Sequence, residues 1–129
     1  MRKMWGSTIY YHSEARNAIA RGVNAVAELV QATMGPMGKN IIIERAMRYP
    51  FVTKDGVTVA NHIKPKEPRE AIGADLCRSA AQKTDEVAGD GTTTAIVLTQ
   101  ELIEQGIRLI EAGFNPVKLK QGMDLALQT

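Results

Sequence analysis

Apolar residues recur every three or four positions over long stretches of the chain, a spacing that predicts amphipathic helices. The first predicted helix follows a candidate N-cap at Ser13, with Glu14 in its first turn. It should end at Gly35-Pro36, because proline cannot continue a helix. Its apolar face consists of Ala15, Ile19, Val23, Val26, Val30 and Met34.

The second half of the chain has the same periodicity in three further segments. One predicted helix ends at Gly89, and the next opens with three threonines and reaches its C-terminal cap near Gly113. Asn115 and Pro116 predict the N-cap and first residue of a last helix, which we expect to continue to Thr129. The face predicted for the segment before Gly89 consists of Ile72, Leu76, Ala80, Thr84 and Val87, widened by Ala74, Cys77 and Ala81.

Short segments rich in β-branched and aromatic residues predict strands instead. The predicted strands lie at 8–11, 40–44 and 51–53, and the last two form a hairpin whose turn spans 46–50. Segment 57–63 is ambiguous between helix and strand, and the charged segment 64–70 is expected to be a solvated connection. The pattern therefore predicts a mainly α fold with a minor β component, a helical bundle with one small β-hairpin.

The composition of the chain limits the classes of protein to which it can belong. The 129 residues are 44% hydrophobic and 23% charged, which is typical of a globular chain. A net charge of +2 without a basic run gives no reason to expect nucleic-acid binding. No apolar stretch has the length of a signal peptide core or a membrane span, so we expect no membrane association and a cytoplasmic location. The single cysteine, Cys77, fits a reducing compartment and is interpreted as a small buried residue rather than a nucleophile.

The strongest local motif is Gly89-Asp90-Gly91-Thr92-Thr93-Thr94 at a predicted helix start. Free backbone N–H groups and the helix dipole favour an anion there, and glycine lets a phosphate approach the backbone. Threonine hydroxyls can donate to phosphate oxygens, and Asp90 would suit a bridging Mg²⁺. The alternative is a plain turn with a capping threonine. Three consecutive threonines argue against it, because threonine is a mediocre helix former.

Two other glycine-containing corners, at 33–40 and 54–56, have the same character, although each alone could be a plain turn. Neither is a P-loop. Gly35 and Gly38 have the wrong spacing, and no Ser or Thr follows Lys39. His12 and His62 have no second ligand at metal spacing, and both are interpreted as surface or capping residues.

Together and in this order, these segments resemble the GroEL-type chaperonins. The resemblance covers nearly the whole chain from about Ser13 onward. It is carried by Ala15-Arg16, Arg21-Gly22-Val23-Asn24, Thr33-Met34-Gly35-Pro36, Gly38-Lys39-Asn40, Thr53-Lys54-Asp55-Gly56-Val57-Thr58-Val59-Ala60, Gly89 to Ala95, Ala112-Gly113-Phe114-Asn115-Pro116 and Leu119-Lys120-Gln121-Gly122. It implies that residues 1–129 are the N-terminal half of the equatorial, ATP-binding domain, and that the intermediate and apical domains are absent.

The resemblance also implies a site for ATP and Mg²⁺. Lys54 is expected to approach the phosphates, Asp90 to hold the metal, and Asp55 to act as the catalytic residue beside the terminal phosphate. The remaining nucleotide contacts are expected at Thr33, Met34, Gly35, Pro36, Gly91, Thr92, Thr93 and Thr94.

The full-length protein is thereby expected to be an ATP-driven folding chaperonin, an ATPase that forms a homo-oligomeric double ring with unfolded client proteins and a co-chaperonin as partners. Segments 54–60 and 72–74 favour the bacterial and organellar class, whereas 84–87 leans toward the archaeal and eukaryotic-cytosolic class. Met37 departs from the family, which usually has lysine there, and the opening through Tyr11 does not resemble it. Two alternatives from other classes are a small Mg-dependent phosphotransfer enzyme using Asp90 and Asp55, and a purely structural helical module.

Overall fold

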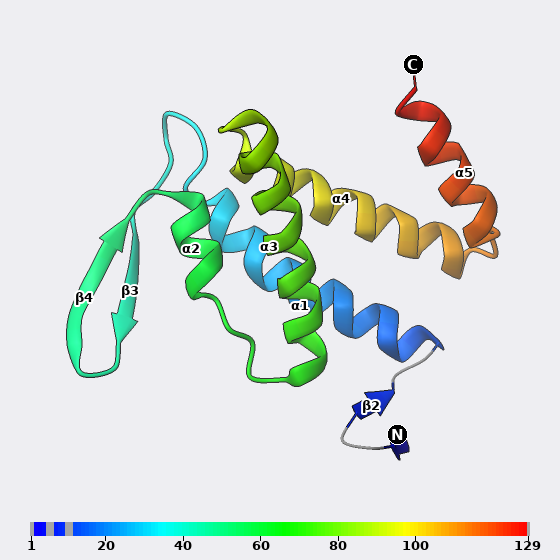
Figure 1. Cartoon of the computed structure of the whole chain (residues 1–129), viewed down its shortest axis with the longest axis horizontal. Helices are drawn as coiled ribbons and strands as arrows, with labels where there is room; N and C mark the ends of the chain where they lie inside the picture. Colours follow the sequence, from blue (N-terminus) through cyan, green and yellow to red (C-terminus); the bar gives the residue numbers. More distant parts are fainter. Residues whose placement is uncertain (1, 5–6, 10–11, 129) are drawn as a thin grey trace.

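A computed structural model describes residues 2–4, 7–9 and 12–128. Three helices make up the body of the molecule, and a fourth short helix joins a projecting hairpin to them (Figure 1). The elements in chain order are β1 (Arg2–Met4), β2 (Ser7–Ile9), α1 (His12–Gln31), β3 (Ile41–Arg45), β4 (Arg48–Thr53), α2 (Gly56–His62), α3 (Pro68–Ala88), α4 (Thr92–Glu111) and α5 (Pro116–Ala126).

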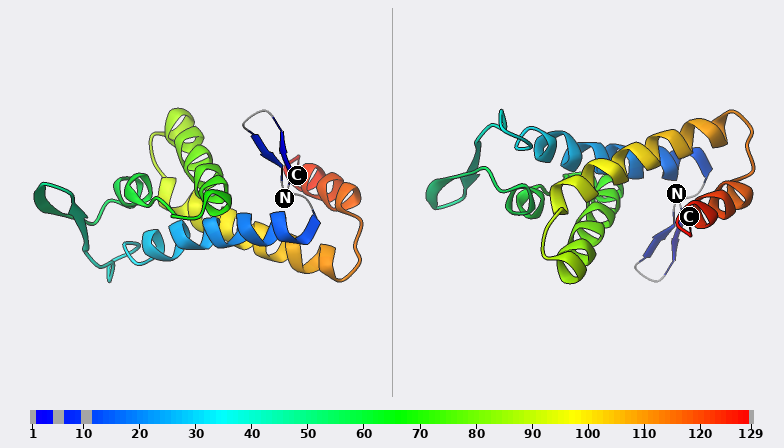
Figure 2. Two further views of the ribbon diagram at one scale, coloured as in Figure 1. Left: turned by 90° about the horizontal axis from the view of Figure 1, so that it is seen from below. Right: turned by 90° about the horizontal axis from the view of Figure 1, so that it is seen from above.

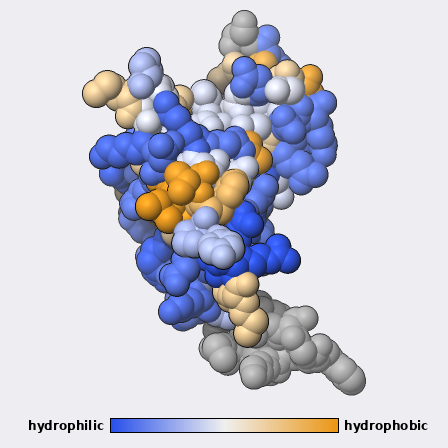
Figure 3. All heavy atoms as spheres, turned by 90° about the vertical axis from the view of Figure 1, so that its left-hand side faces the viewer, coloured by the Kyte–Doolittle hydropathy of each residue, from blue (hydrophilic) through white to orange (hydrophobic). Residues whose placement is uncertain are grey.

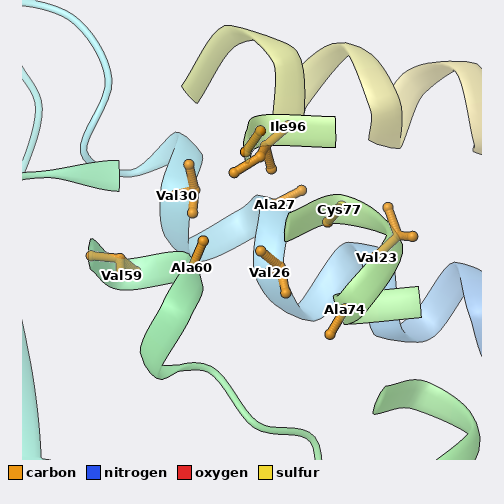
Figure 4. Packing of buried hydrophobic residues seen from close by; sticks show 10 residues of the cluster. Val23, Val26, Ala27, Val30, Val59, Ala60, Ala74, Cys77 and Ile96 are labelled. Carbon is orange, nitrogen blue, oxygen red and sulfur yellow. The ribbon is translucent and has the colours of Figure 1, made fainter. Parts of the chain in front are cut away.

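The hydrophobic core lies where α1, α3 and α4 meet. Helices α1 and α4 run side by side, and α3 packs against both of them (Figure 2). The buried side chains point toward one another from these helices and from α2 (Figure 4). The cluster consists of Val23, Val26, Ala27, Val30, Val59, Ala60, Ala74, Cys77, Ala81 and Ile96. Most members are small, so the helices approach closely and the packing is sensitive to added volume.

The packed face of α3 differs from the predicted one. Gly73, Ala74, Cys77 and Ala81 are buried, whereas Ile72 and Leu76 are about half exposed and Val87 is almost fully exposed. The reason is the closeness of α1. A Cβ atom built on Gly73 would lie 2.1 Å from the carbonyl oxygen of Ile19, so only small residues fit at this contact. The large apolar side chains are therefore turned away from α1.

The β3–β4 hairpin was predicted, but its turn is shorter than expected. The strands pair antiparallel with Ile42 opposite Val52, and residues 46–47 make the turn, with Met47 at a left-handed φ of 57°. Pro50 lies inside β4 rather than in the turn, as an edge strand allows. Figure 3 views the molecule from the hairpin side and shows an apolar patch within a mainly hydrophilic surface.

The ambiguous segment after the hairpin is helical and forms α2. Its C-terminal carbonyl groups accept hydrogen bonds from the Arg78 guanidinium, which donates to Ile63 O at 2.8 Å and Ala60 O at 3.2 Å. The connection to α3 is shorter than predicted, because Pro68 occupies the first turn of α3, where its missing N–H costs nothing. Arg78 thus ties the C-terminal end of α2 to α3.

The junction of α4 and α5 follows the predicted signals. Gly113 has φ 93° just after α4, and the Gly113 and Phe114 N–H groups donate to carbonyls of the last turn, which is a Schellman ending. The Asn115 side chain caps α5 by accepting from Val117 N at 2.8 Å. Helix α5 ends at Ala126 instead of continuing to Thr129, and it buries none of its residues.

The N-terminal segment departs from prediction. β1 and β2 form a small antiparallel pair, of which only the part of β2 at Thr8 and Ile9 was predicted. The predicted strand residues Tyr10 and Tyr11 lie outside the described residues. Ser13 is not the N-cap, because α1 already begins at His12. No helix among the described residues is long and apolar enough to cross a membrane.

Candidate functional site

The three glycine-containing corners of the sequence come together at one cavity of about 300 Å³. It lies where the end of α1, the β4–α2 junction and the start of α4 converge. The lining residues are Thr33, Met34, Gly35, Lys54, Asp55, Gly56, Asp90, Gly91, Thr92, Thr93 and Thr94. Of the residues singled out from the sequence, Pro36 is not among those that line it. Segments far apart in the chain thus form a single polar site.

The first turn of α4 lines the cavity with a geometry that favours an anion. Gly89 and Gly91 both have left-handed backbone angles, with φ 68° and 81°, which suits glycine because it lacks a Cβ. Gly91 is the N-cap and no side chain caps this helix end. The first intrahelical bond runs from Ala95 N to Gly91 O at 2.9 Å, so the N–H groups of 92–94 precede the helical ladder. Such N–H groups and the helix dipole bind phosphate.

Asp90 places a carboxylate beside this helix start. Its Oδ1 accepts from Gly91 N at 2.6 Å, which fixes the carboxylate against the loop. No described residue donates a hydrogen bond to its other oxygen, Oδ2, so this oxygen could bind an external cation. Two carboxylates, from Asp90 and Asp55, line the cavity together with one cation, Lys54. This charge balance disfavours a bare polyphosphate and favours one that carries a divalent metal ion.

The donor set of the cavity fits Mg²⁺ bound with phosphate. Carboxylate oxygens are the ligands that Mg²⁺ prefers, and it is commonly held by one or two carboxylates with the remaining positions taken by phosphate and water. Among the described residues there is no group of three or more His, Cys, Asp or Glu side chains that could hold a metal by itself. The arrangement therefore suits a metal that arrives with its nucleotide.

Thr33 and Lys54 line the cavity from the α1 and β4 sides. Thr33 is a buried polar residue, and its hydroxyl donates to Val30 O at 2.7 Å, so that proton is committed to the end of α1. The corner at 33–40 requires glycine at position 38, because no side chain fits there. A Cβ atom there would lie 2.1 Å from Thr33 O and 2.8 Å from Lys54 Cε. The Lys54 side chain therefore passes close to the loop that follows α1.

Asp55 is the N-cap of α2. Its carboxylate accepts from Thr58 N at 3.0 Å, from the Thr58 hydroxyl at 2.5 Å and from Val57 N at 3.4 Å. These bonds stabilise the ionised form, so the pKa of Asp55 lies below its usual value, chiefly because of the Thr58 hydroxyl. A carboxylate with a lowered pKa is a weak proton acceptor and a good ligand for cations or ordered water.

Gly56 also lines the cavity, although it was not among the predicted site residues. A Cβ atom on Gly56 would lie 2.3 Å from Thr93 Oγ1 and 3.1 Å from Val30 Cγ1. The start of α2 therefore touches the α4 first turn directly. The Asp-Gly pair could have indicated this position, but a turn explained it equally well.

The other chemically reactive side chains lie outside the cavity. Cys77 is buried in the core, as predicted, and burial raises the pKa of its thiol from 9.0 to about 11. His62 stacks on Phe51 at a ring distance of 6.3 Å, with Nδ1 2.8 Å from Thr58 O. Both contacts are structural.

Comparison with known proteins identifies the family. A family model described as the TCP-1/cpn60 chaperonin family matches residues 26–129. A solved structure described as the crystal structure of a group III chaperonin in the open state is 30% identical, with a TM-score of 0.77. The match covers 89% of this chain and 22% of the other chain. The predicted fold class is confirmed, whereas the bacterial and organellar class stays a prediction. The chain belongs to the TCP-1/cpn60 chaperonin family.

Proposed function

We propose that this chain is the N-terminal half of a chaperonin equatorial domain and that its cavity binds the phosphates of Mg-ATP. The observation that carries the proposal is the convergence of an uncapped α4 N-terminus with Asp90, Asp55 and Lys54 in one cavity. Phosphate would rest beside Gly91 on the N–H and hydroxyl groups of 92–94, and Lys54 would approach it as a point charge.

Asp90 and Asp55 have different roles in this proposal. Asp90 would hold Mg²⁺, which neutralises phosphate charge and orients the phosphate oxygens. Asp55 would lie beside the terminal phosphate, where its ionised carboxylate orients water rather than storing a proton. Thr33, Met34 and Gly35 would contact the remainder of the nucleotide from the α1 side.

The whole protein would be an ATP-driven folding chaperonin. ATP shifts such a ring between states only if one state binds it more tightly, so the phosphate site supplies the energy difference. Ring assembly, client proteins, a co-chaperonin and a cytoplasmic location belong to this proposal. So does the bacterial and organellar class, which rests on segments 54–60 and 72–74.

The direct test is nucleotide-dependent stability of the chain. We expect Mg-ATP at about 100 times its Kd to stabilise the fold by about 2.7 kcal/mol, measured by thermal or urea unfolding. Asp90→Asn should abolish the part of the shift that requires Mg²⁺. The matched control is Asp124→Asn, since Asp124 is an exposed carboxylate paired with Lys120 on α5, remote from the cavity. Its response should equal that of the unmodified chain.

The outcomes separate the proposal from its rivals. A chain without any nucleotide-dependent stabilisation would be the purely structural module. A monomer that turns ATP over at an ordinary enzymatic rate would be the small phosphotransfer enzyme. We expect poor hydrolysis, because the Asp55 carboxylate, with its lowered pKa, is a weak proton acceptor for an attacking water. The mass of the native polypeptide, compared with 14.1 kDa, tests whether the chain is part of a larger chaperonin.

A further inference from the structure

Thr58 lies one turn into α2 and does not line the cavity, yet it is the main partner of a residue that does. Its backbone N–H and its hydroxyl both donate to Asp55 Oδ2, at 3.0 and 2.5 Å. The backbone bond is an ordinary helix cap that any residue at this position would supply. The hydroxyl bond is additional and requires Ser or Thr.

The two oxygens of Asp55 are consequently unequal. Oδ2 accepts two hydrogen bonds from Thr58, whereas Oδ1 accepts one long bond from Val57 N at 3.4 Å. The backbone of Asp55 is also held, because its N–H donates to Thr53 Oγ1 at 3.0 Å. With Oδ2 occupied and the backbone fixed, Oδ1 is the oxygen that has capacity left for a ligand in the cavity.

We propose that Thr58 is a positioning residue for the nucleotide site: its hydroxyl locks the Asp55 carboxylate in one rotamer and leaves Oδ1 for the ordered water beside the terminal phosphate of the Mg-nucleotide. This inference rests on the proposed function and adds to it a residue that acts only through Asp55. A carboxylate that is already held in its binding orientation loses little conformational entropy when the ligand binds. A carboxylate that rotates between rotamers would therefore support weaker binding.

The experiment compares Thr58→Val, which is nearly isosteric but lacks the hydroxyl, with Thr58→Ser, which retains it. We expect Thr58→Val to weaken Mg-ATP binding about five-fold, the usual size of one lost hydrogen bond, and Thr58→Ser to restore it to within about two-fold. The matched control is Thr99→Val. Its hydroxyl donates to Ala95 O at 2.7 Å within α4, away from the cavity, so its loss should leave binding unchanged.

A double-mutant cycle distinguishes positioning from a general loss of stability. In an Asp55→Asn background, Thr58→Val should have no further effect on Mg-ATP affinity, because the carboxylate it orients is gone. Equal losses of affinity in both backgrounds would overturn the inference.

A second readout needs no nucleotide. The Hα–Hβ couplings of Asp55 should report one rotamer in the unmodified chain and Thr58→Ser, and averaging in Thr58→Val.

The two proposals fail differently. If the unmodified chain does not respond to Mg-ATP, the proposed function is overturned and this inference falls with it. If the unmodified chain binds Mg-ATP and Thr58→Val binds it equally well, or if the Asp55 couplings of Thr58→Val are unaveraged, only the role of Thr58 is overturned.

Discussion

Gly56 is the residue at which the two halves of the site touch. It begins α2, and its missing side chain is what lets the Thr93 hydroxyl approach the backbone of that helix. Asp55 precedes it, and Asp55 and Asp90 line the same cavity, so the contact joins the two elements that carry these carboxylates. Adding a methyl group at position 56 should therefore disturb both the packing of α2 against α4 and the candidate site.

Gly56→Ala should destabilise the fold by about 1–3 kcal/mol, because the added Cβ would lie 2.3 Å from Thr93 Oγ1. Urea unfolding measures this loss, and the Mg-ATP shift should shrink with it. The matched control is Gly122→Ala in α5, where a Cβ meets nothing within 4 Å and alanine favours the helix. A Gly56→Ala chain as stable as the unmodified one would contradict the observed contact.

Cys77 should be unreactive in the folded chain. With a thiol pKa of about 11 instead of 9.0, the fraction of thiolate near pH 8 falls about 100-fold, and burial also blocks access. Mass spectrometry after iodoacetamide should show slow modification in buffer and rapid modification in urea. Complete labelling of the folded chain within the time that suffices in urea would contradict this prediction.

The same thiol makes stability depend on alkaline pH. The folded chain holds the Cys77 proton more tightly than the unfolded chain, so the unfolded state loses protons first as the pH rises. The contribution of the protonated Cys77 thiol to the free energy of unfolding is therefore complete below about pH 9 and is lost as the pH approaches 11. Urea midpoints should fall over this range, and a Cys77→Ala chain should lack this part of the decline.

At the scale of elements, the contact between α1 and α3 determines which sides of the helices are buried. Gly73 approaches the α1 backbone at Ile19, and Gly22 of α1 approaches Glu70 of α3 in the same way, with a built Cβ 1.8 Å from the Glu70 carbonyl oxygen. The Arg21 guanidinium lies 2.8 Å from the Glu70 carboxylate beside this contact. Because the Arg21 side chain is about half exposed, this ion pair should add little to stability. Close backbone packing, rather than ion pairing, fixes this helix pair.

Gly73→Ala should consequently cost about 1–3 kcal/mol in urea unfolding, because the methyl group must push α3 away from the Ile19 carbonyl. Gly106→Ala in α4 is the matched control. Its nearest neighbour would be Leu119 Cδ2 at an ordinary 3.9 Å, so helix propensity should dominate and stability should hold or rise. A neutral Gly73→Ala would show that the helices can separate without loss.

At the scale of the whole molecule, much apolar surface remains exposed. Val117 and Leu125 of α5 are 64% and 65% exposed, and Leu98 and Leu102 share one exposed face of α4. A groove between the end of α4 and α5 is also mainly apolar, lined by Leu109, Phe114, Asn115, Lys118, Leu119, Gly122, Met123 and Ala126. Surfaces of this kind promote association.

The chain by itself should therefore self-associate, with an average mass that rises with concentration in light scattering. Replacing Leu98 and Leu102 with glutamine should reduce the association, because it removes apolar area from one face. Met47→Gln at the hairpin turn, where the side chain is fully exposed, is the comparison that locates the contact. A chain that stays monomeric at all concentrations would contradict the prediction.

Local signals in the sequence predicted four of the helices, the β3–β4 hairpin and the three corners that line the candidate cavity. Asn115-Pro116, Gly113 and the Gly89–Thr94 motif act through capping and backbone conformation within a few residues. Tertiary structure alone decided that Ile72 and Leu76 are half exposed while Ala74 and Cys77 are buried, since the closeness of α1 excludes large side chains. The contact of Gly56 with Thr93 also depends on the tertiary structure, because the two residues are far apart in the sequence and no local pattern predicts that they meet.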